Sequence, residues 1–194
     1  MNPEAISAIK KASALCKRSK EAILGASLQT LKNSPGEIFH EYSTYTFAIN
    51  GDASFKNLSE LNLNQNDLIK VRIKTKHNSW ETKSAFSLHF GGNTNKLRLI
   101  EVNKQAVSET CQSLCPGLNE KDIIEVLELC KEEFAIIPEL TTIKNLNGHS
   151  RLMTGDILQL GTAFQAQQQA DTTASAIHLE TVLITANGAK ILTS

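Results

Sequence analysis

The chain has 194 residues, of which 41% are hydrophobic and 21% charged; this is the composition of a globular protein and excludes a disordered one. No apolar run is long enough to cross a bilayer and the first residues show no secretory signal, so we expect cytoplasmic synthesis without a signal peptide. The net charge is zero, which argues against general nucleic-acid binding. Residues 1–35 nevertheless carry +4 and residues 105–160 carry −5, a separation that suits head-to-tail assembly of subunits or an internal contact. The alternative for each cluster is a solvated helix face.

The first predicted domain, residues 1–35, is a docking helix. Pro3 suits the first turn of a helix, and the apolar residues of segment 3–31 fall mostly on one stripe. Pro35 and Gly36 end it. Because the apolar stripe has no aromatic residue, we expect it to dock on protein rather than on a membrane.

The second predicted domain, residues 36–104, is an antiparallel β domain. Its apolar residues alternate with polar ones, as in segment 67–75, where Lys70, Arg72 and Lys74 occupy the face opposite to the apolar one. The strands predicted from this alternation are 45–49, 67–75, 86–90 and 96–102. We expect a meander that forms a partly open barrel or one half of a sandwich.

The remaining chain predicts two further domains, so the fold class is α+β. Residues 105–161 form a helical segment in which Asn119 caps a helix over 120–133, followed by a short helix and a strand that ends at Leu160. Residues 162–194 form a polar linker and a C-terminal β-hairpin that turns at Asn187-Gly188.

Residues that carry catalysis or bind metal do not form a recognisable motif in this sequence. The five histidines (His40, His77, His89, His149 and His178) stand apart, and the four cysteines (Cys16, Cys111, Cys115 and Cys130) lack the spacing of a zinc or redox site. We therefore expect no catalytic residue, no metal and no cofactor. One enzymatic alternative stays open, which is a dispersed active site that brings Cys111 or Cys115 close to His89 or His149.

The segment from Pro138 to Leu160 combines a short helix, a polar turn and a strand that opens with Gly155. It resembles the second half of a LysM domain, and the resemblance extends over residues 119–160. The positions that carry the resemblance are Phe134, Leu140, Asn145, Leu146, Leu152, Gly155, Leu158 and Leu160.

The resemblance implies two functions. LysM-like modules serve as structural joints in phage tail baseplates and contractile injection machines, so our leading hypothesis is a non-enzymatic structural component of a multi-subunit assembly, carried in a virion or similar particle. LysM domains also bind glycans, so the alternative is a peptidoglycan-binding module. Its binding loop would be formed by Asn147, Gly148, His149, Ser150 and Arg151.

Overall fold

One seven-stranded antiparallel sheet organises the chain, which confirms the α+β class. The computed structural model describes residues 3–129, 135–137, 150–165 and 174–194. The sheet order is β1-β2-β3-β6-β5-β4, with β7 paired to β6. The strands are β1 (Ser43–Ile49), β2 (Leu68–His77), β3 (Trp80–His89), β4 (Ala135–Ile137), β5 (Ile157–Gln165), β6 (Ser175–Thr185) and β7 (Gly188–Ile191). The helices are α1 (Pro3–Leu24), α2 (Leu28–Asn33), α3 (Thr94–Ser113) and α4 (Glu120–Leu129), with short 3-10 turns at Pro35–Glu37 and Leu58–Glu60.

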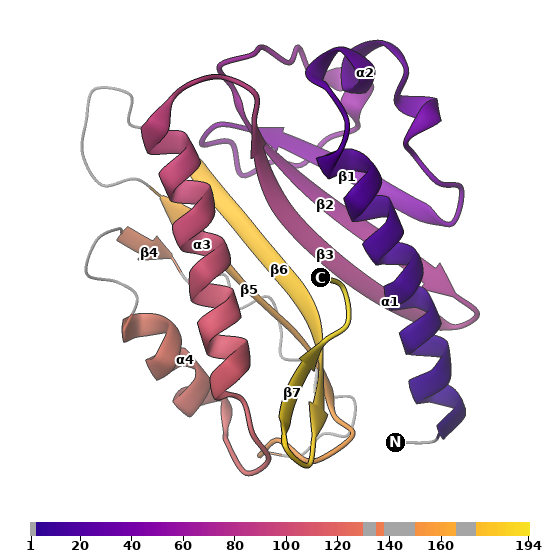
Figure 1. The fold of residues 1–194 in the computed structure, drawn as a ribbon, viewed down its shortest axis with the longest axis vertical. Helices are drawn as coiled ribbons and strands as arrows, with labels where there is room; N and C mark the ends of the chain where they lie inside the picture. The colour runs from indigo at the N-terminus through magenta and orange to yellow at the C-terminus, as the bar shows by residue number, and fades with distance from the viewer. Residues whose placement is uncertain (1–2, 130–134, 138–149, 166–173) are drawn as a thin grey trace.

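Helices α1 and α3 lie side by side across the same face of the sheet (Figure 1). Ile9, Cys16 and Ile23 of α1 recur at helical spacing and are buried. Cys16 and Ile23 belong to a hydrophobic cluster with alternate residues of β2. Burial of one such large aliphatic side chain contributes roughly 2 kcal/mol to stability. The apolar stripe predicted to dock on a partner therefore packs against the sheet of its own chain.

The prediction of a strand over segment 96–102, the last of the β domain, is wrong, because these residues belong to α3. The Asn93 side chain caps this helix by accepting hydrogen bonds from the amides of Asn95 and Lys96, both at 3.1 Å. Over residues 97–102 the apolar residues alternate as they would in a strand. Over the full length of α3, however, the buried residues recur every three or four positions, as in a helix. The sheet is also neither a barrel nor a sandwich half, since its strands follow one open order from β1 to β4 and helices cover one of its faces (Figure 1).

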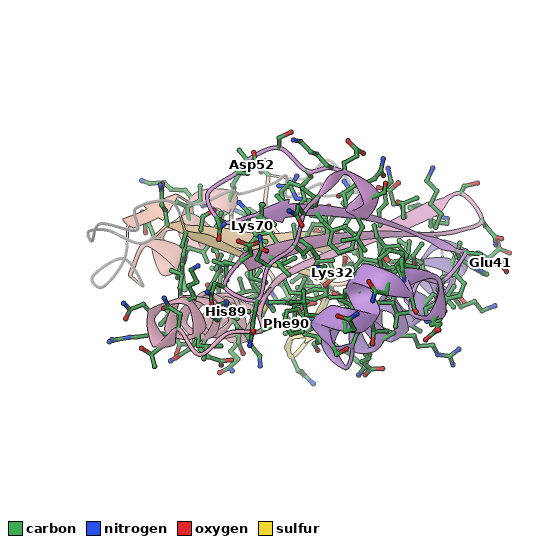
Figure 2. The ribbon with its side chains drawn as sticks, turned by 90° about the horizontal axis from the view of Figure 1, so that it is seen from above. Lys32, Glu41, Asp52, Lys70, His89 and Phe90 are labelled. Atoms are coloured by element: carbon green, nitrogen blue, oxygen red, sulfur yellow. The ribbon has the colours of Figure 1, made fainter. Side chains whose placement is uncertain are left out.

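Strands β1 and β2 are joined by a long connection, residues 50–67. Asn50 has a positive φ of 50°, and its side-chain oxygen accepts a hydrogen bond from the Leu68 amide at 3.0 Å. The connection then crosses the sheet on the side away from α1 and α3, where Figure 2 shows Asp52 beyond Lys70. The C-terminal hairpin formed by β6 and β7 is confirmed.

Strand β5 lies inside the large sheet, between β6 and β4. It pairs with β6 over nine residues, from Ile157 opposite Leu183 to Gln165 opposite Ser175. Leu158 and Leu160 are buried in a cluster that also includes residues of α3 and α4. The division of the chain into four domains stays a prediction. No helix within the described ranges is long and apolar enough to cross a membrane.

Candidate functional site

Two adjoining cavities open on the cavity face, which we define as the face of the sheet opposite α1 and α3. The Phe55 cavity has a volume of about 220 Å³, and the Lys83 cavity has a volume of about 290 Å³. The two cavities share Arg72 and Ile177 as lining residues. The Phe55 cavity is also lined by Gly51, Phe55, Lys70, Gln165 and Ser175, and the Lys83 cavity by Thr46, Lys74, Lys83, Gln159 and Leu179.

The pleat of β2 places its cations on this face. Successive side chains of a strand point to opposite sides, so Ile69, Val71 and Ile73 enter the cluster that includes α1. Lys70, Arg72 and Lys74 therefore face the cavities.

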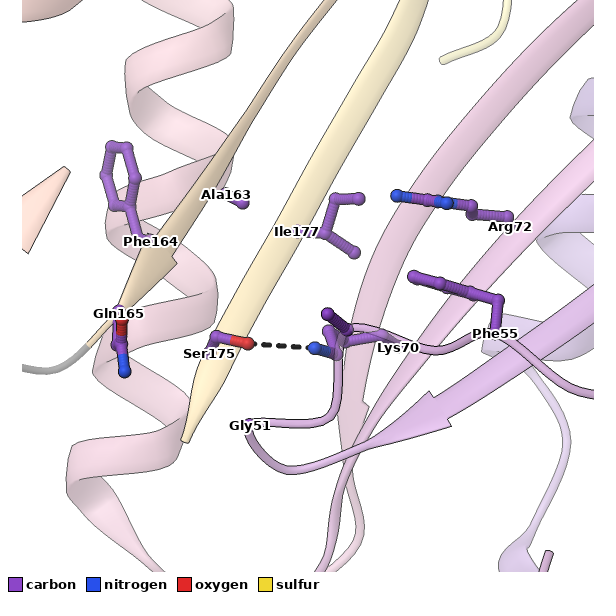
Figure 3. A pocket seen from close by; sticks show the side chains of 10 residues that line it. Gly51, Phe55, Lys70, Arg72, Ala163, Phe164, Gln165, Ser175 and Ile177 are labelled. Atoms are coloured by element: carbon purple, nitrogen blue, oxygen red, sulfur yellow. Dashed lines mark hydrogen bonds between the residues drawn. The ribbon is translucent and has the colours of Figure 1, made fainter. Parts of the chain in front are cut away.

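The loop between β1 and β2 fixes the middle of the site. The Arg72 guanidinium lies 3.7 Å from the centroid of the Phe55 ring, which is cation–π geometry (Figure 3). Lys70 is only 5% exposed. Its ammonium group donates one hydrogen bond to the Asp52 carbonyl and another to Ser175 Oγ at 2.8 Å. Lys70 thus joins the loop to β6 while keeping its charge at the wall of the cavity.

At the Lys83 cavity, the carboxylate of Glu81 lies between two of the lining lysines. Glu81 lies 2.8 Å from Lys74 Nζ and 3.7 Å from Lys83 Nζ. These side chains are partly exposed, so each pair contributes at most about 1 kcal/mol to stability. Glu81 offsets part of the positive charge here without lining either cavity.

A buried ionic cluster lies on the opposite, helix-bearing side of the sheet. Glu180 on β6 accepts hydrogen bonds from Lys20 of α1 and, at 2.6 Å, from Thr193 Oγ1; His178 Nε2 lies 3.0 Å from its Oε1. Burial alone would raise the pKa of Glu180. The hydrogen bond from His178 and the positive charges of Lys20 and His178 outweigh burial and lower this pKa to about 2. A further cavity of about 320 Å³ beside this cluster is lined by residues of both helices.

Most of the loop predicted to bind glycan lies outside the described residues, namely Asn147, Gly148 and His149. Ser150 and Arg151 are exposed, and Arg151 Nη1 donates to the Gly117 carbonyl at 3.3 Å. The glycan-binding loop therefore stays a prediction. The structure does not bring Ser150 or Arg151 to either cavity of the cavity face.

A thiol centre at Cys111 and His89 is excluded by their placement. His89 accepts a hydrogen bond from the Asn93 amide at the start of α3, whereas Cys111 lies near the end of that helix, about 27 Å further along at 1.5 Å per residue. Cys111 is buried, and this burial raises the pKa of its thiol to about 12. Burial also raises the pKa of Cys16, to about 11.

We expect iodoacetamide to modify native protein at Cys115 and to spare Cys16 and Cys111 at pH 8. The thiolate is the reacting species, and only Cys115 of these three is exposed. Peptide mapping by mass spectrometry measures the modification at each cysteine. Unfolding in urea provides the control, since all three thiols should then react. Equal rates at Cys111 and Cys115 in native protein would contradict the burial of Cys111.

The alternation in segment 68–74 indicates only one part of the cavity face, the cations of β2. The cations were visible in the sequence, but a run of exposed lysines on a strand normally indicates a solvated face. The missing signal was the loop of residues 50–57, which covers these cations and supplies Phe55.

Comparison with known proteins identifies the fold. No family model and no curated protein matches the chain. Methionine aminopeptidase from Thermotoga maritima superposes with a TM-score of 0.76 at 16% identity, covering 100% of this chain and 98% of that one. Prolidase from Pyrococcus horikoshii gives a TM-score of 0.74 at 15% identity and is covered over 62% of its length. A variant of Escherichia coli aminopeptidase P gives 0.79 at 12% identity, with 56% of its length covered. At these identities the likeness shows the fold, which is the pita-bread fold of these peptidases.

These similarities correct several predictions. The LysM resemblance of residues 119–160 is wrong, because the peptidase structures match the chain from end to end. The hypothesis of a non-enzymatic component of a phage tail, baseplate or virion is contradicted, since the structures with this fold are enzymes. The enzymatic alternative agrees better with these structures than the leading hypothesis did.

The donor set of the cavity face differs from that of a metal site. Proteins hold divalent ions with carboxylate, imidazole or thiolate groups. Three or more such residues do not converge anywhere in the described parts of the chain. The described lining of the two cavities instead carries Lys70, Arg72, Lys74 and Lys83. The described residues of the cavity face therefore lack the donor groups of a metal centre.

Proposed function

We propose that this protein recognises peptides, which it binds along the cavity face. The observation that carries the proposal is the pair of cavities that adjoin at Arg72 and Ile177. Strand β2 covers about 13 Å from Lys70 to Lys74, at roughly 3.3 Å per residue. This is the length of about four residues of an extended peptide. Peptides are also the substrates that the names of the structural neighbours indicate.

The chemistry of the lining supports this ligand class. Ile177 and Leu179 supply apolar surface, and Thr46 supplies a hydroxyl group beside it. Small-ligand sites combine an apolar wall with a few fixed polar groups in this way. Hydroxyl groups both donate and accept hydrogen bonds, so they can pair with the amides and carbonyls of a peptide backbone.

We expect Thr46→Trp to abolish peptide binding by filling the Lys83 cavity, while tryptophan remains compatible with a β-strand. Fluorescence anisotropy with a library of labelled tetrapeptides measures binding to wild-type protein and to the variant. Thr94→Trp is the matched control, because Thr94 is exposed at the start of α3 and lines neither cavity. Absence of saturable binding to wild-type protein, or equal binding by both variants, would contradict the proposal.

Peptide hydrolysis is the second candidate function, and the fold shared with aminopeptidases and prolidases favours it. Mass spectrometry of the same peptides after incubation with the protein measures it. Shorter products that wild-type protein forms and Thr46→Trp does not form would assign the reaction to the cavity face. Intact peptides after prolonged incubation would count against hydrolysis while leaving peptide binding in place.

A further inference from the structure

A third cavity, which we call the helix cavity, lies on the side of the sheet opposite the cavity face. It is the cavity beside the Glu180 cluster, and its volume of about 320 Å³ exceeds that of the Phe55 cavity and of the Lys83 cavity. Helix α1 packs mainly on β2 and β3, whereas α3 packs mainly on β5 and β6. The helix cavity lies between these two packing units, where Figure 1 shows β6 between the helices. The proposed binding of peptides does not use it.

The walls of the helix cavity are apolar. Hydrophobic side chains from both helices and from two strands line it, namely Leu24, Phe86, Ile100, Val107 and Ile191. Leu24 is 50% exposed, so an apolar molecule in the cavity would remove part of this side chain from water. An apolar cavity of about 150 Å³ is large enough to bind benzene. The helix cavity therefore has room for a substituted ring of that size.

The charged groups of the helix cavity are balanced. Glu180 accepts hydrogen bonds from Lys20 and from Thr193 Oγ1, and His178 Nε2 lies 3.0 Å from the same carboxylate. The other charged side chains of the described lining are one glutamate and one lysine, both exposed on α3. Two lysines thus stand against two glutamates, and the buried carboxylate already has its donors. This lining favours a neutral ligand over an anion or a cation.

His178 adds one polar group that the ionic cluster does not use fully. Residues 178 and 180 are two positions apart on β6, so both side chains face the helix cavity. The His178 side chain is 12% exposed, and its Nε2 contacts Glu180. Its Nδ1 has no hydrogen-bond partner within the described parts of the chain. An imidazole nitrogen accepts a hydrogen bond when unprotonated and donates one when protonated, whereas a hydroxyl group does both. A hydroxyl group can therefore pair with Nδ1 in either state.

We propose that the helix cavity binds a small neutral molecule that joins an apolar body to one hydroxyl group. The apolar body lies against Leu24 and Phe86, and the hydroxyl group meets Nδ1 of His178. This inference does not depend on peptide binding, because the helix cavity and the cavity face lie on opposite sides of the sheet.

The experiment uses three probes that share an ethyl-substituted ring and differ in their polar group: 4-ethylphenol, 4-ethylanisole and 4-ethylbenzoate. Isothermal titration calorimetry against the whole chain measures the Kd of each. We expect 4-ethylphenol to bind about fivefold more tightly than 4-ethylanisole, which lacks the O–H donor, and more tightly than the charged 4-ethylbenzoate. In NMR spectra of protein with 15N-labelled histidine, 4-ethylphenol should shift the ring signals of His178 and leave those of His77 unchanged, since His77 does not line the cavity.

Ser108→Trp should abolish the binding of 4-ethylphenol, because Ser108 is half-buried in the lining and tryptophan fills the cavity from α3. Gln105→Trp is the matched control, since Gln105 is exposed on the same helix and does not line the cavity. His178→Phe keeps an aromatic ring and removes both ring nitrogens, so it should bind 4-ethylphenol and 4-ethylanisole with equal affinity. Thermal unfolding checks that the variants are folded. If Ser108→Trp or His178→Phe unfolds, the NMR shifts of wild-type protein decide.

Each part of the proposal has an outcome that overturns it. Tightest binding of 4-ethylbenzoate would overturn the assignment of a neutral ligand. Equal affinity of wild-type protein for 4-ethylphenol and 4-ethylanisole would overturn the role of the hydroxyl group. Absence of saturable binding of all three probes, or equal shifts at His77 and His178, would overturn the site. Peptide binding is measured separately with Thr46→Trp, so it stands or fails independently of these results.

Discussion

Lys20→Met should lower the free energy of unfolding by about 3–5 kcal/mol, because it removes one partner of a buried ion pair and leaves the other in place. The side chains of Lys20 and Glu180 are 10% and 2% exposed, so little solvent is present to replace the lost ammonium group. Urea unfolding followed by circular dichroism measures the change. Lys17→Met is the matched control on the same helix. Lys17 is exposed and pairs with Glu21 at 3.9 Å, so its loss should cost less than about 0.5 kcal/mol.

The same cluster makes stability depend on acid pH. The pKa of Glu180 is about 2 in the folded protein and 4.5 without its folded surroundings. A carboxyl whose pKa is lowered by folding contributes stability that is complete above its unfolded pKa and is lost as pH falls through the folded value. This contribution, about 3 kcal/mol, is therefore lost between pH 4.5 and pH 2. The difference in unfolding free energy between wild-type protein and Glu180→Gln should shrink over this interval. A difference that stays constant from pH 7 to pH 2.5 would contradict the low pKa.

Phe47→Ala should lower the free energy of unfolding by about 3–5 kcal/mol, because it leaves a cavity in the core beneath α1. Phe47 is fully buried in the cluster that includes Ile23 of the helix, and its ring stacks on Phe39 with centroids 5.7 Å apart. Chemical denaturation measures the loss. A cost below about 1 kcal/mol would show that this part of the core is not packed as described.

Phe55→Ala is the counterpart on the other face of the sheet. Phe55 is half-buried and lines the Phe55 cavity, so its replacement should cost only about 1 kcal/mol of stability but should weaken the binding of peptides there. Phe47→Ala, studied below its unfolding transition, should bind these peptides with unchanged affinity. The two variants thus separate the residues that hold the fold from the residues that hold the ligand.

Local patterns in the sequence predicted those elements whose partners lie nearby in the chain. Strands β1, β2 and β3 and the hairpin of β6 and β7 follow from alternation and from turn residues such as Asn187-Gly188. Helix α1 was predicted with its start at Pro3, although a separate short helix, α2, follows its end at Leu24. Helix α3 was missed over residues 96–102, because six or seven residues are too few to distinguish two periodicities when apolar residues stand close together.

The pairing of distant strands could not be predicted in this way. Strands β3 and β6 meet at Ala85 and Leu179, which are 94 positions apart in the chain (179 − 85). Nothing in the local pattern of either strand specifies the other. The candidate site depends on this pairing, since Arg72 and Ile177 come from the two halves that it joins. Ordinary globular patterns therefore predicted the α+β class, while the site required the three-dimensional structure.

The ionic cluster at Glu180 also constrains the order of folding events. Lys20 meets a residue 160 positions further along the chain, and its ammonium group reaches the carbonyl of Thr193 as well. Contacts of such long range form slowly, because a large loop must close before they contribute. During synthesis, α1 emerges before β6 and β7 and cannot make this contact until they follow. The nascent chain therefore carries Lys20 without its carboxylate partner while the 160 positions up to Glu180 are synthesised, and this pair closes only after β6 has emerged.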